Sequence, residues 1–241
     1  MLAIIRRELA AYFCTPLAYV FTVIYLVLSG VFTFYIGQFF ERGQANLTAF
    51  FAFQPWLFLL LMPALSMRLW AEEYRSGSVE LLLTLPVARW HVSTAKFLAA
   101  WLFTGMALSL TFPIWLTVNY LGEPDNGVIA AAYLGCWLMA GAYLAIGVCV
   151  SAATSNQVIA FIVTVTVCAV FVVAGSSIIM DVFPTWLDRE TWTALASMSF
   201  LVRFDAVSRG VIDLGDLGFF IMIMVLWLLA SVALIDARRT A

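Results

Sequence analysis

The stretch "RLWAEEYRSGSVELLLTLPVARWHVSTAKF", residues 68–97, lies between two long apolar runs and is the part of the chain densest in charge. It holds four of the twelve Lys and Arg residues, three of the fourteen acidic residues and the only histidine, His91. The apolar runs beside it, residues 50–67 and 96–120, are each long enough to cross a hydrocarbon core ~30 Å thick as a helix. The sequence therefore places a charged segment between two predicted membrane spans.

The composition places the whole chain in a membrane. Of its 241 residues, 64% are hydrophobic and 11% charged, whereas a soluble domain has about 25% charged residues. We predict an all-α membrane protein that forms one transmembrane domain, residues 1–241, with no room for a sizeable soluble domain. The six predicted spans are residues 17–38, 50–67, 96–120, 128–150, 158–179 and 217–235.

An amphipathic helix is predicted before the first span, within residues 1–15. Leu2, Ile5 and Leu9 recur at helical spacing, which is typical of a helix lying in the membrane interface. Pro16 cannot continue a helix interior and so ends this one. The alternative is a frayed tail.

Residues 181–216, between the last two spans, are too polar to cross and too apolar for a water-exposed linker. We predict short helices at the outer interface, where tryptophan is favoured. Two interpretations stay open, a lid over a transport pathway and a plug that only covers helix ends. The aromatic residues of this predicted extracellular lid are Trp186, Trp192, Phe200 and Phe204.

The distribution of Lys and Arg predicts the orientation. An even number of spans puts both termini on one side, together with residues 68–96. That side has eight Lys and Arg residues and the other has four, Arg42, Arg189, Arg203 and Arg209. Cytoplasmic loops carry the excess of Lys and Arg, so the termini and the charged segment are predicted to be cytoplasmic.

Catalytic chemistry is not predicted for this chain. The predicted spans hold no ionisable residue at mid-depth, where proton relays and ion paths usually show one; Arg68, Lys96 and Asp236 fall at span ends, within reach of the headgroups. There is no Gly-x-x-x-x-Gly-Lys-[Ser/Thr] phosphate loop. The four cysteines, Cys14, Cys136, Cys149 and Cys168, lack metal or disulfide spacing and are interpreted as packing residues. We expect no catalytic, metal or cofactor site, and any energy for uphill movement must come from another polypeptide.

The middle of the charged segment predicts a short helix that packs against something. Gly77 and Ser78 provide a start, Glu80 falls in the first turn, where the helix macrodipole favours an anion, and Pro86 provides an end. Such a helix is too short to be stable alone, and its apolar ridge needs a groove. The groove belongs either to a partner protein or to the chain's own bundle.

Two segments carry a family resemblance. "PALSMRLWAEEYRSGSVELLLTLPVARWHVSTAKFLAAW" (63–101) and "SFLVRFDAVSRGVIDLGDLGFF" (199–220) resemble ABC-2 type transporter permeases, especially the GldF/NosY-like branch of gliding-motility and nitrous-oxide-reductase maturation permeases. The resemblance implies a non-catalytic permease subunit of the bacterial inner membrane that exports or extrudes a substrate.

The same resemblance implies partners and a coupling element. A second permease subunit, identical or related, would complete the pathway, and a separate ABC ATPase would bind ATP and Mg. A periplasmic or accessory membrane partner is a further expectation, and nucleic acid is not. The residues implied to dock the ATPase are Glu72, Glu73, Arg75, Gly77, Ser78, Glu80, Leu82 and Leu83.

Two other functions compete with an exporter. One is a membrane anchor or mechanotransmission scaffold that relays ATPase strokes to periplasmic partners without moving a solute. The other is an ion-coupled carrier, which is disfavoured by the lack of any intramembrane carboxylate.

Overall fold

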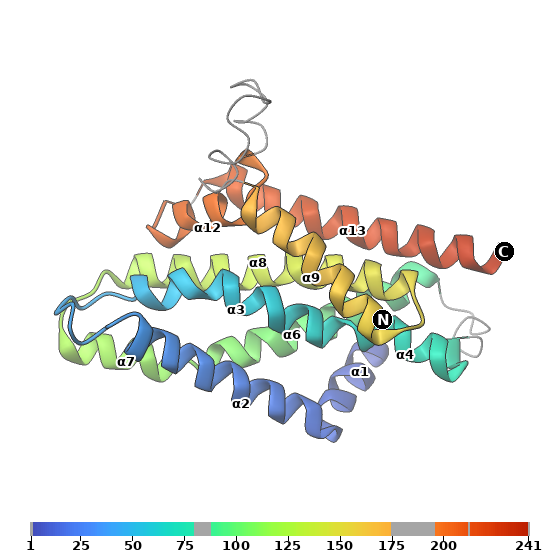
Figure 1. Cartoon of the computed structure of the whole chain (residues 1–241), viewed down its shortest axis with the longest axis horizontal. Helices are drawn as coiled ribbons and strands as arrows, with labels where there is room; N and C mark the ends of the chain where they lie inside the picture. Colours follow the sequence, from blue (N-terminus) through green and yellow to red (C-terminus); the bar gives the residue numbers. More distant parts are fainter. Residues whose placement is uncertain (1, 80–87, 175–195, 212, 241) are drawn as a thin grey trace.

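The computed structural model describes residues 2–79, 88–174, 196–211 and 213–240, and all its elements in these ranges are helical (Figure 1). The elements are α1 (Leu2–Cys14), α2 (Pro16–Val31), the π-helix η1 (Phe32–Ile36), α3 (Thr48–Ser66), α4 (Arg68–Ser76), α6 (Arg89–Ser109), α7 (Phe112–Leu121), α8 (Asn126–Ala153), α9 (Gln157–Val173), α12 (Phe200–Ser208) and α13 (Leu214–Thr240).

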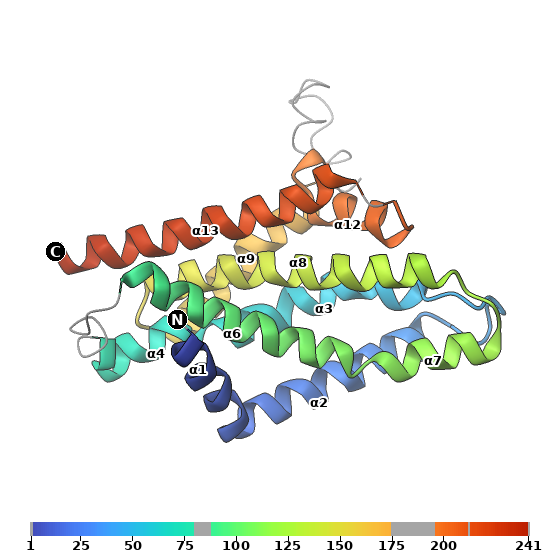
Figure 2. The ribbon, with the colours of Figure 1, turned by 180° about the vertical axis from the view of Figure 1, so that it is seen from behind.

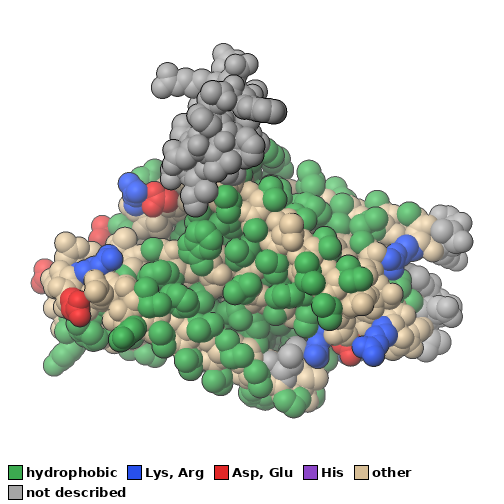
Figure 3. Space-filling model, in the orientation of Figure 1, with side chains coloured by type: hydrophobic (Ala, Val, Ile, Leu, Met, Phe, Trp, Pro, Cys, Tyr) green, Lys and Arg blue, Asp and Glu red, His purple; other side chains and the backbone are tan. Residues whose placement is uncertain are grey.

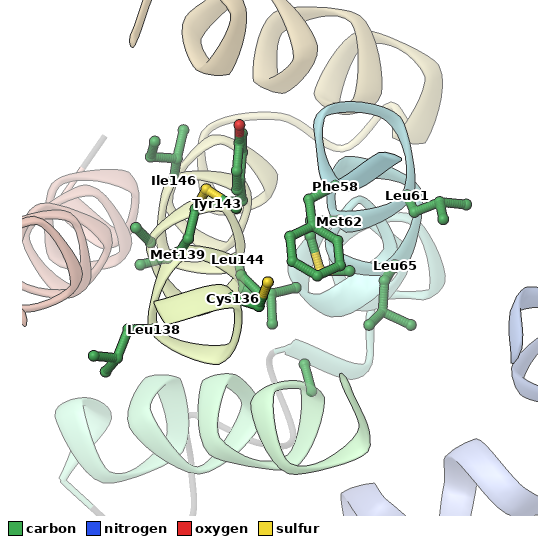
Figure 4. Packing of buried hydrophobic residues seen from close by; sticks show 14 of the residues in the cluster. Phe58, Leu61, Met62, Leu65, Cys136, Leu138, Met139, Tyr143, Leu144 and Ile146 are labelled. Carbon is green, nitrogen blue, oxygen red and sulfur yellow. The ribbon is translucent and has the colours of Figure 1, made fainter. Parts of the chain in front are cut away.

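Helix α8 is the centre of the bundle. It packs against α3, α4, α6, α9, α12 and α13, and 83% of its most apolar stretch is buried, against 22% for the first span. Against α3, the side chains of Phe58 and Met62 point toward α8, and those of Cys136 and Leu144 point back (Figure 4). The core of the fold is therefore built around the fourth predicted span.

Small residues let α8 approach its neighbours closely. A Cβ added at Gly147 would lie 1.9 Å from Ser66 Oγ of α3, and one at Gly141 would lie 2.6 Å from the sulfur of Met224 in α13. In lipid there is no hydrophobic driving force that brings helices together. Helices associate there through close backbone packing at small residues. The glycines of α8 thus fix the distances between α8 and the two helices beside it.

Most predicted boundaries agree with the structure to within a few residues. Helix α1 ends at Cys14, before Pro16, as predicted. The third span differs in two ways: α6 begins at Arg89, so residues 89–96 are helix and not loop, and the span breaks between α6 and α7. Pro113 causes the break, because it lacks an N–H and stands near the start of α7, where proline is tolerated.

Five helical segments in the described ranges are long and apolar enough to cross a membrane. They run Ala18–Ile36, Thr48–Ser76, Arg89–Leu121, Asn126–Ala153 and Leu214–Arg238. Helix α9, the predicted fifth span, is apolar but has 17 residues in the described part of the chain, fewer than those five, so the six-span topology stays a prediction.

Both chain ends lie at the same end of the bundle, which we call the terminal end (Figures 1 and 2). Helix α4 lies there too, whereas α12 and the α7–α8 turn lie toward the opposite end. On the face that Figure 3 shows, charged side chains gather at the two ends, with apolar side chains between them. This pattern fits a bundle whose waist lies in hydrocarbon.

Candidate functional site

A side chain of α8 fixes the position where the charged segment begins. Between α3 and α4, the hydroxyl of Ser151 accepts hydrogen bonds from the backbone N–H groups of Trp70 (3.1 Å) and Ala71 (3.0 Å) and donates one to the carbonyl of Met67 (2.9 Å). A side chain inserted into the backbone hydrogen-bond ladder is a usual cause of a helix kink. Ser151 is fully buried, so it holds the α3–α4 junction against the central helix.

Helix α4 ends inside the segment where the coupling element is predicted. Gly77 adopts the left-handed conformation (φ 73°) at the C-cap of α4, a role suited to glycine. The backbone of Ser78 and Val79 is helical again, but the rest of the helix predicted to start at Gly77 and Ser78 lies outside the described residues and stays a prediction. Gly77 therefore ends one helix immediately before the next begins.

The structure places only some of the predicted coupling residues. Glu72 and Arg75 are exposed on α4, Glu73 is half-buried, and the Ser78 hydroxyl lies 2.9 Å from that of Ser76. Glu80, Leu82 and Leu83 lie outside the described residues. Docking of an ATPase on this element stays a prediction.

A buried lysine joins three helices at the terminal end. Lys96 of α6, the only lysine in the chain, has a side chain only 3% exposed. Its Nζ lies 2.7 Å from Glu73 Oε1 of α4 and 3.5 Å from Glu8 Oε2 of α1, and 5.5 Å from the centre of the Trp70 ring. A buried charge is tolerated only when it is paired and hydrogen-bonded. Lys96 with Glu8 and Glu73, here called the lysine triad, therefore ties the N-terminal helix and α4 to α6.

This arrangement corrects the expectation that Lys96 reaches the headgroups from a span end. Because α6 begins at Arg89, Lys96 lies two turns inside the helix and faces the bundle. Asp236 lies near the end of the last span, as expected, and forms an ion pair with Arg89.

Helix α1 is fixed to α6 by more than charge. The ring of Tyr12 stacks on that of Phe103 with centroids 5.2 Å apart. Burial, reinforced by the nearby Glu8 carboxylate, raises the pKa of the Tyr12 phenol, so the hydroxyl stays neutral. The hydrogen bond from Arg7 to Glu8 (2.6 Å) raises the pKa of the Arg7 guanidinium. The Glu8 carboxylate therefore interacts with both Arg7 and Lys96.

The last helix, α13, contacts α4, α6 and α8 at the terminal end. In addition to the Arg89–Asp236 pair, the Arg238 guanidinium lies 4.8 Å from the centre of the Tyr74 ring of α4 and donates to the carbonyl of Ala153 at the end of α8. One turn deeper, Ser93 of α6 and Ser231 of α13 are hydrogen-bonded (2.7 Å) and buried. Helices α4, α6, α8 and α13 therefore meet around the charged segment.

At the opposite end, Phe200 and Phe204 of the predicted lid are buried within the bundle. Phe200 packs against Tyr143 of α8, Phe171 of α9 and Phe219 of α13, with ring centroids 5.1–6.0 Å apart. Helix α12 is further held to α13 by the Arg203–Asp216 ion pair (2.6 Å). These two phenylalanines anchor the segment; Trp186 and Trp192 lie outside the described residues, and the lid itself stays a prediction.

The cysteines carry no metal or redox geometry. Cys136, Cys149 and Cys168 are buried free thiols, as their interpretation as packing residues requires, whereas Cys14 is exposed at the end of α1. Over the ranges that the structure describes, no group of three or more His, Cys, Asp or Glu side chains is arranged to hold a metal ion.

Sequence reasoning missed Ser151, Glu8 and the burial of Lys96. A weak signal existed for Lys96, since a lysine at the edge of a long apolar run needs a partner if it is buried. Ser151 gave no signal, because a serine at the end of an apolar span usually bonds within its own helix.

These features define the class of protein: a helical membrane protein with apolar spans around one central helix. The end that carries both termini is charged and is held together by ion pairs and hydrogen bonds. Residues 2–235 match the ABC-2 family transporter protein family, and the chain belongs to this family. The chain is also 39% identical over 70 residues to heme exporter protein B of Rhodobacter capsulatus, a match that covers 29% of this chain and 32% of that protein. The chain thus matches only about a third of that relative's length, and the GldF/NosY-like branch stays a prediction.

Proposed function

We propose that this chain is the permease subunit of an ATP-driven exporter in the bacterial inner membrane, with both termini in the cytoplasm. It pairs with a second permease subunit, identical or related, and a separate ABC ATPase docks on residues 68–96. ATP and Mg bind to the ATPase and not to this chain. Membership in the ABC-2 family supports this function.

The lysine triad is the observation that carries the mechanism. A push on the segment after Gly77 reaches α4 directly, and α4 is bonded through Glu73 to Lys96 of α6 and thereby to Glu8 of α1. The Ser151 hydroxyl supplies a second connection, from the start of α4 to the central helix. A displacement at the segment would therefore move α1, α6 and α8 together, which is what coupling ATP hydrolysis to the spans requires.

The test is co-purification of the permease with a co-expressed candidate ABC ATPase. We expect Glu80→Lys to weaken binding, because it places a cation in the first turn of the predicted coupling helix, a penalty of about 0.3–1 kcal/mol. Leu82→Asp should weaken it more, since an unpaired charge in a dry contact costs several kcal/mol. Arg42→Glu, in the loop at the opposite end, is the matched control. Normal ATPase binding and activity in both variants would exclude this element as the docking site.

Vesicle transport separates an exporter from a mechanical scaffold. Heme is the first cargo to test, because the matched relative is a heme exporter protein. ATP-dependent accumulation of heme in inverted vesicles would support export. ATPase stimulation without accumulation of any tested solute would support a scaffold that relays ATPase strokes.

A further inference from the structure

A pocket of about 250 Å³ opens beside the lysine triad, between α1, the α3–α4 junction and α6. Its wall contains apolar surface from Leu65 and Leu69 and a set of ionisable and hydroxyl groups. The polar residues that matter here are Glu8, Tyr12, Arg68, Glu72, Glu73 and Lys96. Helix α1, which lies at the terminal end of the bundle (Figure 2), forms one wall of the pocket.

Several polar groups of this pocket are left without partners once the triad is formed. Within the described part of the chain, Arg68 makes no hydrogen bond or ion pair, and its Nε is buried. The Tyr12 hydroxyl and Glu73 Oε2 are also buried without a partner. Buried polar groups are almost always hydrogen-bonded to protein, to water or to a ligand. The pocket therefore offers two unused donors, from Arg68 and Tyr12, and one unused carboxylate oxygen.

The charges around the pocket select the kind of ligand. Three carboxylates and two cations line it, and Lys96 is already used by Glu8 and Glu73. The unpaired charges are one guanidinium, on Arg68, and the carboxylate of Glu72, beside the free oxygen of Glu73. A purely anionic ligand would satisfy Arg68 but meet these carboxylates. A ligand with both an anionic and a cationic group satisfies both sets.

We propose that this pocket binds the headgroup of a phospholipid that carries a phosphate and a primary ammonium, as phosphatidylethanolamine does. The planar guanidinium of Arg68 matches phosphate geometry, and the neutral Tyr12 hydroxyl donates to another phosphate oxygen. The ammonium donates to Glu72 and to the free oxygen of Glu73. The apolar wall of Leu65 and Leu69 takes the start of an acyl chain. An amphipathic helix such as α1 lies at the depth of the headgroups, so the ligand reaches the pocket without leaving the membrane.

The test is lipid retention measured by native mass spectrometry on the delipidated full-length chain in detergent. Phosphatidylethanolamine, phosphatidylglycerol and phosphatidylcholine with identical acyl chains are added in turn. We expect preferential retention of phosphatidylethanolamine, because phosphatidylglycerol lacks an ammonium and the quaternary ammonium of phosphatidylcholine has no N–H to donate. Equal retention of all three lipids would overturn the proposal. So would equal retention of phosphatidylethanolamine and phosphatidylglycerol, which indicates a plain anion site.

Variants separate this pocket from general lipid binding. Arg68→Gln and Glu72→Gln each remove a group without a partner in the described chain, so both should fold, which tryptophan fluorescence on heating checks. Each should lower phosphatidylethanolamine retention by about tenfold, the effect of one lost charge-assisted hydrogen bond. Arg75→Gln, on the same helix but outside the pocket, is the control and should retain the lipid. Unchanged retention in both pocket variants contradicts the proposal. If Arg68→Gln instead releases a co-purifying ATPase while lipid retention stays constant, the pocket receives a protein side chain and the proposal fails.

Discussion

Replacing Lys96 by methionine should destabilise the chain by about 3 kcal/mol, because it leaves the Glu73 carboxylate without a cation and Glu8 with Arg7 alone. Methionine keeps most of the apolar stem, so packing changes little. Removing one member of a buried ion pair costs about 3–5 kcal/mol, whereas an exposed pair contributes about 0–1 kcal/mol. The side chain of Lys96 is 3% exposed, but those of Glu8 and Glu73 are 14% and 18% exposed. Water can partly solvate these carboxylates, which puts the expected cost at the lower end of the first range.

A double-mutant cycle tests whether the loss comes from the pair. Glu73→Gln removes the carboxylate at 2.7 Å and leaves the lysine with Glu8 at 3.5 Å. The double variant Lys96→Met/Glu73→Gln should be more stable than the sum of the single effects predicts, by about 1–3 kcal/mol, because neither charge is then left buried.

The assay is equilibrium unfolding by SDS in mixed micelles, followed by the fluorescence of the nine tryptophans. Arg75→Met, an exposed site on α4 with no ion pair to any described residue, is the control and should stay within about 0.5 kcal/mol of the unmodified chain. A Lys96→Met variant as stable as this control would refute the argument that the triad is a buried, paired charge. Additive effects in the cycle would refute the Glu73–Lys96 pairing.

Three further predictions concern other positions. Ser151→Ala leaves the N–H groups of Trp70 and Ala71 buried without an acceptor, so the same unfolding assay should show a loss of about 1–3 kcal/mol; unchanged stability would show that α4 does not depend on this hydroxyl. Gly147→Ala places a Cβ 1.9 Å from Ser66 Oγ and should cost about 1–3 kcal/mol by overpacking, whereas Gly30→Ala, with nothing within 4 Å of the added Cβ, should be neutral or stabilising; equal effects would contradict the close α3–α8 packing. With the native cysteines replaced, Ser197→Cys should react with a membrane-impermeant thiol reagent from outside intact cells and Ser76→Cys only after permeabilisation, and the reverse pattern would invert the proposed orientation.

The helices could be predicted from the sequence because their signals are local. Long apolar runs set the spans, and Pro16 and Gly77 mark where one helix gives way to the next. The break before α7 was missed although its signal, Pro113, is local as well. The run from 96 to 120 is apolar on both sides of the break, so hydrophobicity alone joined α6 and α7.

The site depended on which helix faces meet, and the sequence pattern does not contain that information. Lys96 and Glu73 are 23 residues apart and Ser151 lies about 80 residues from Trp70 and Ala71. A lysine near a span end normally extends to the interface. The packing of α1 on α6 and the contact between Glu73 of α4 and Lys96 close that route and turn Lys96 inward. The predicted coupling residues were chosen by resemblance, and the structure brings one of them, Glu73, into the triad.

Because Lys96 is the only lysine of the chain, its amine is a single built-in chemical probe. The side chain of Lys96 is 3% exposed and its Nζ is paired with Glu73 and Glu8, so in the closed arrangement it should resist acylation by amine-reactive esters. If α4 swings away from α6 during a transport cycle, the amine becomes exposed to the reagent. The acylation rate of the peptide that contains Lys96 can then be compared with and without ATP turnover. A higher rate during turnover would show that this end of the bundle opens, and the measurement needs no engineered label.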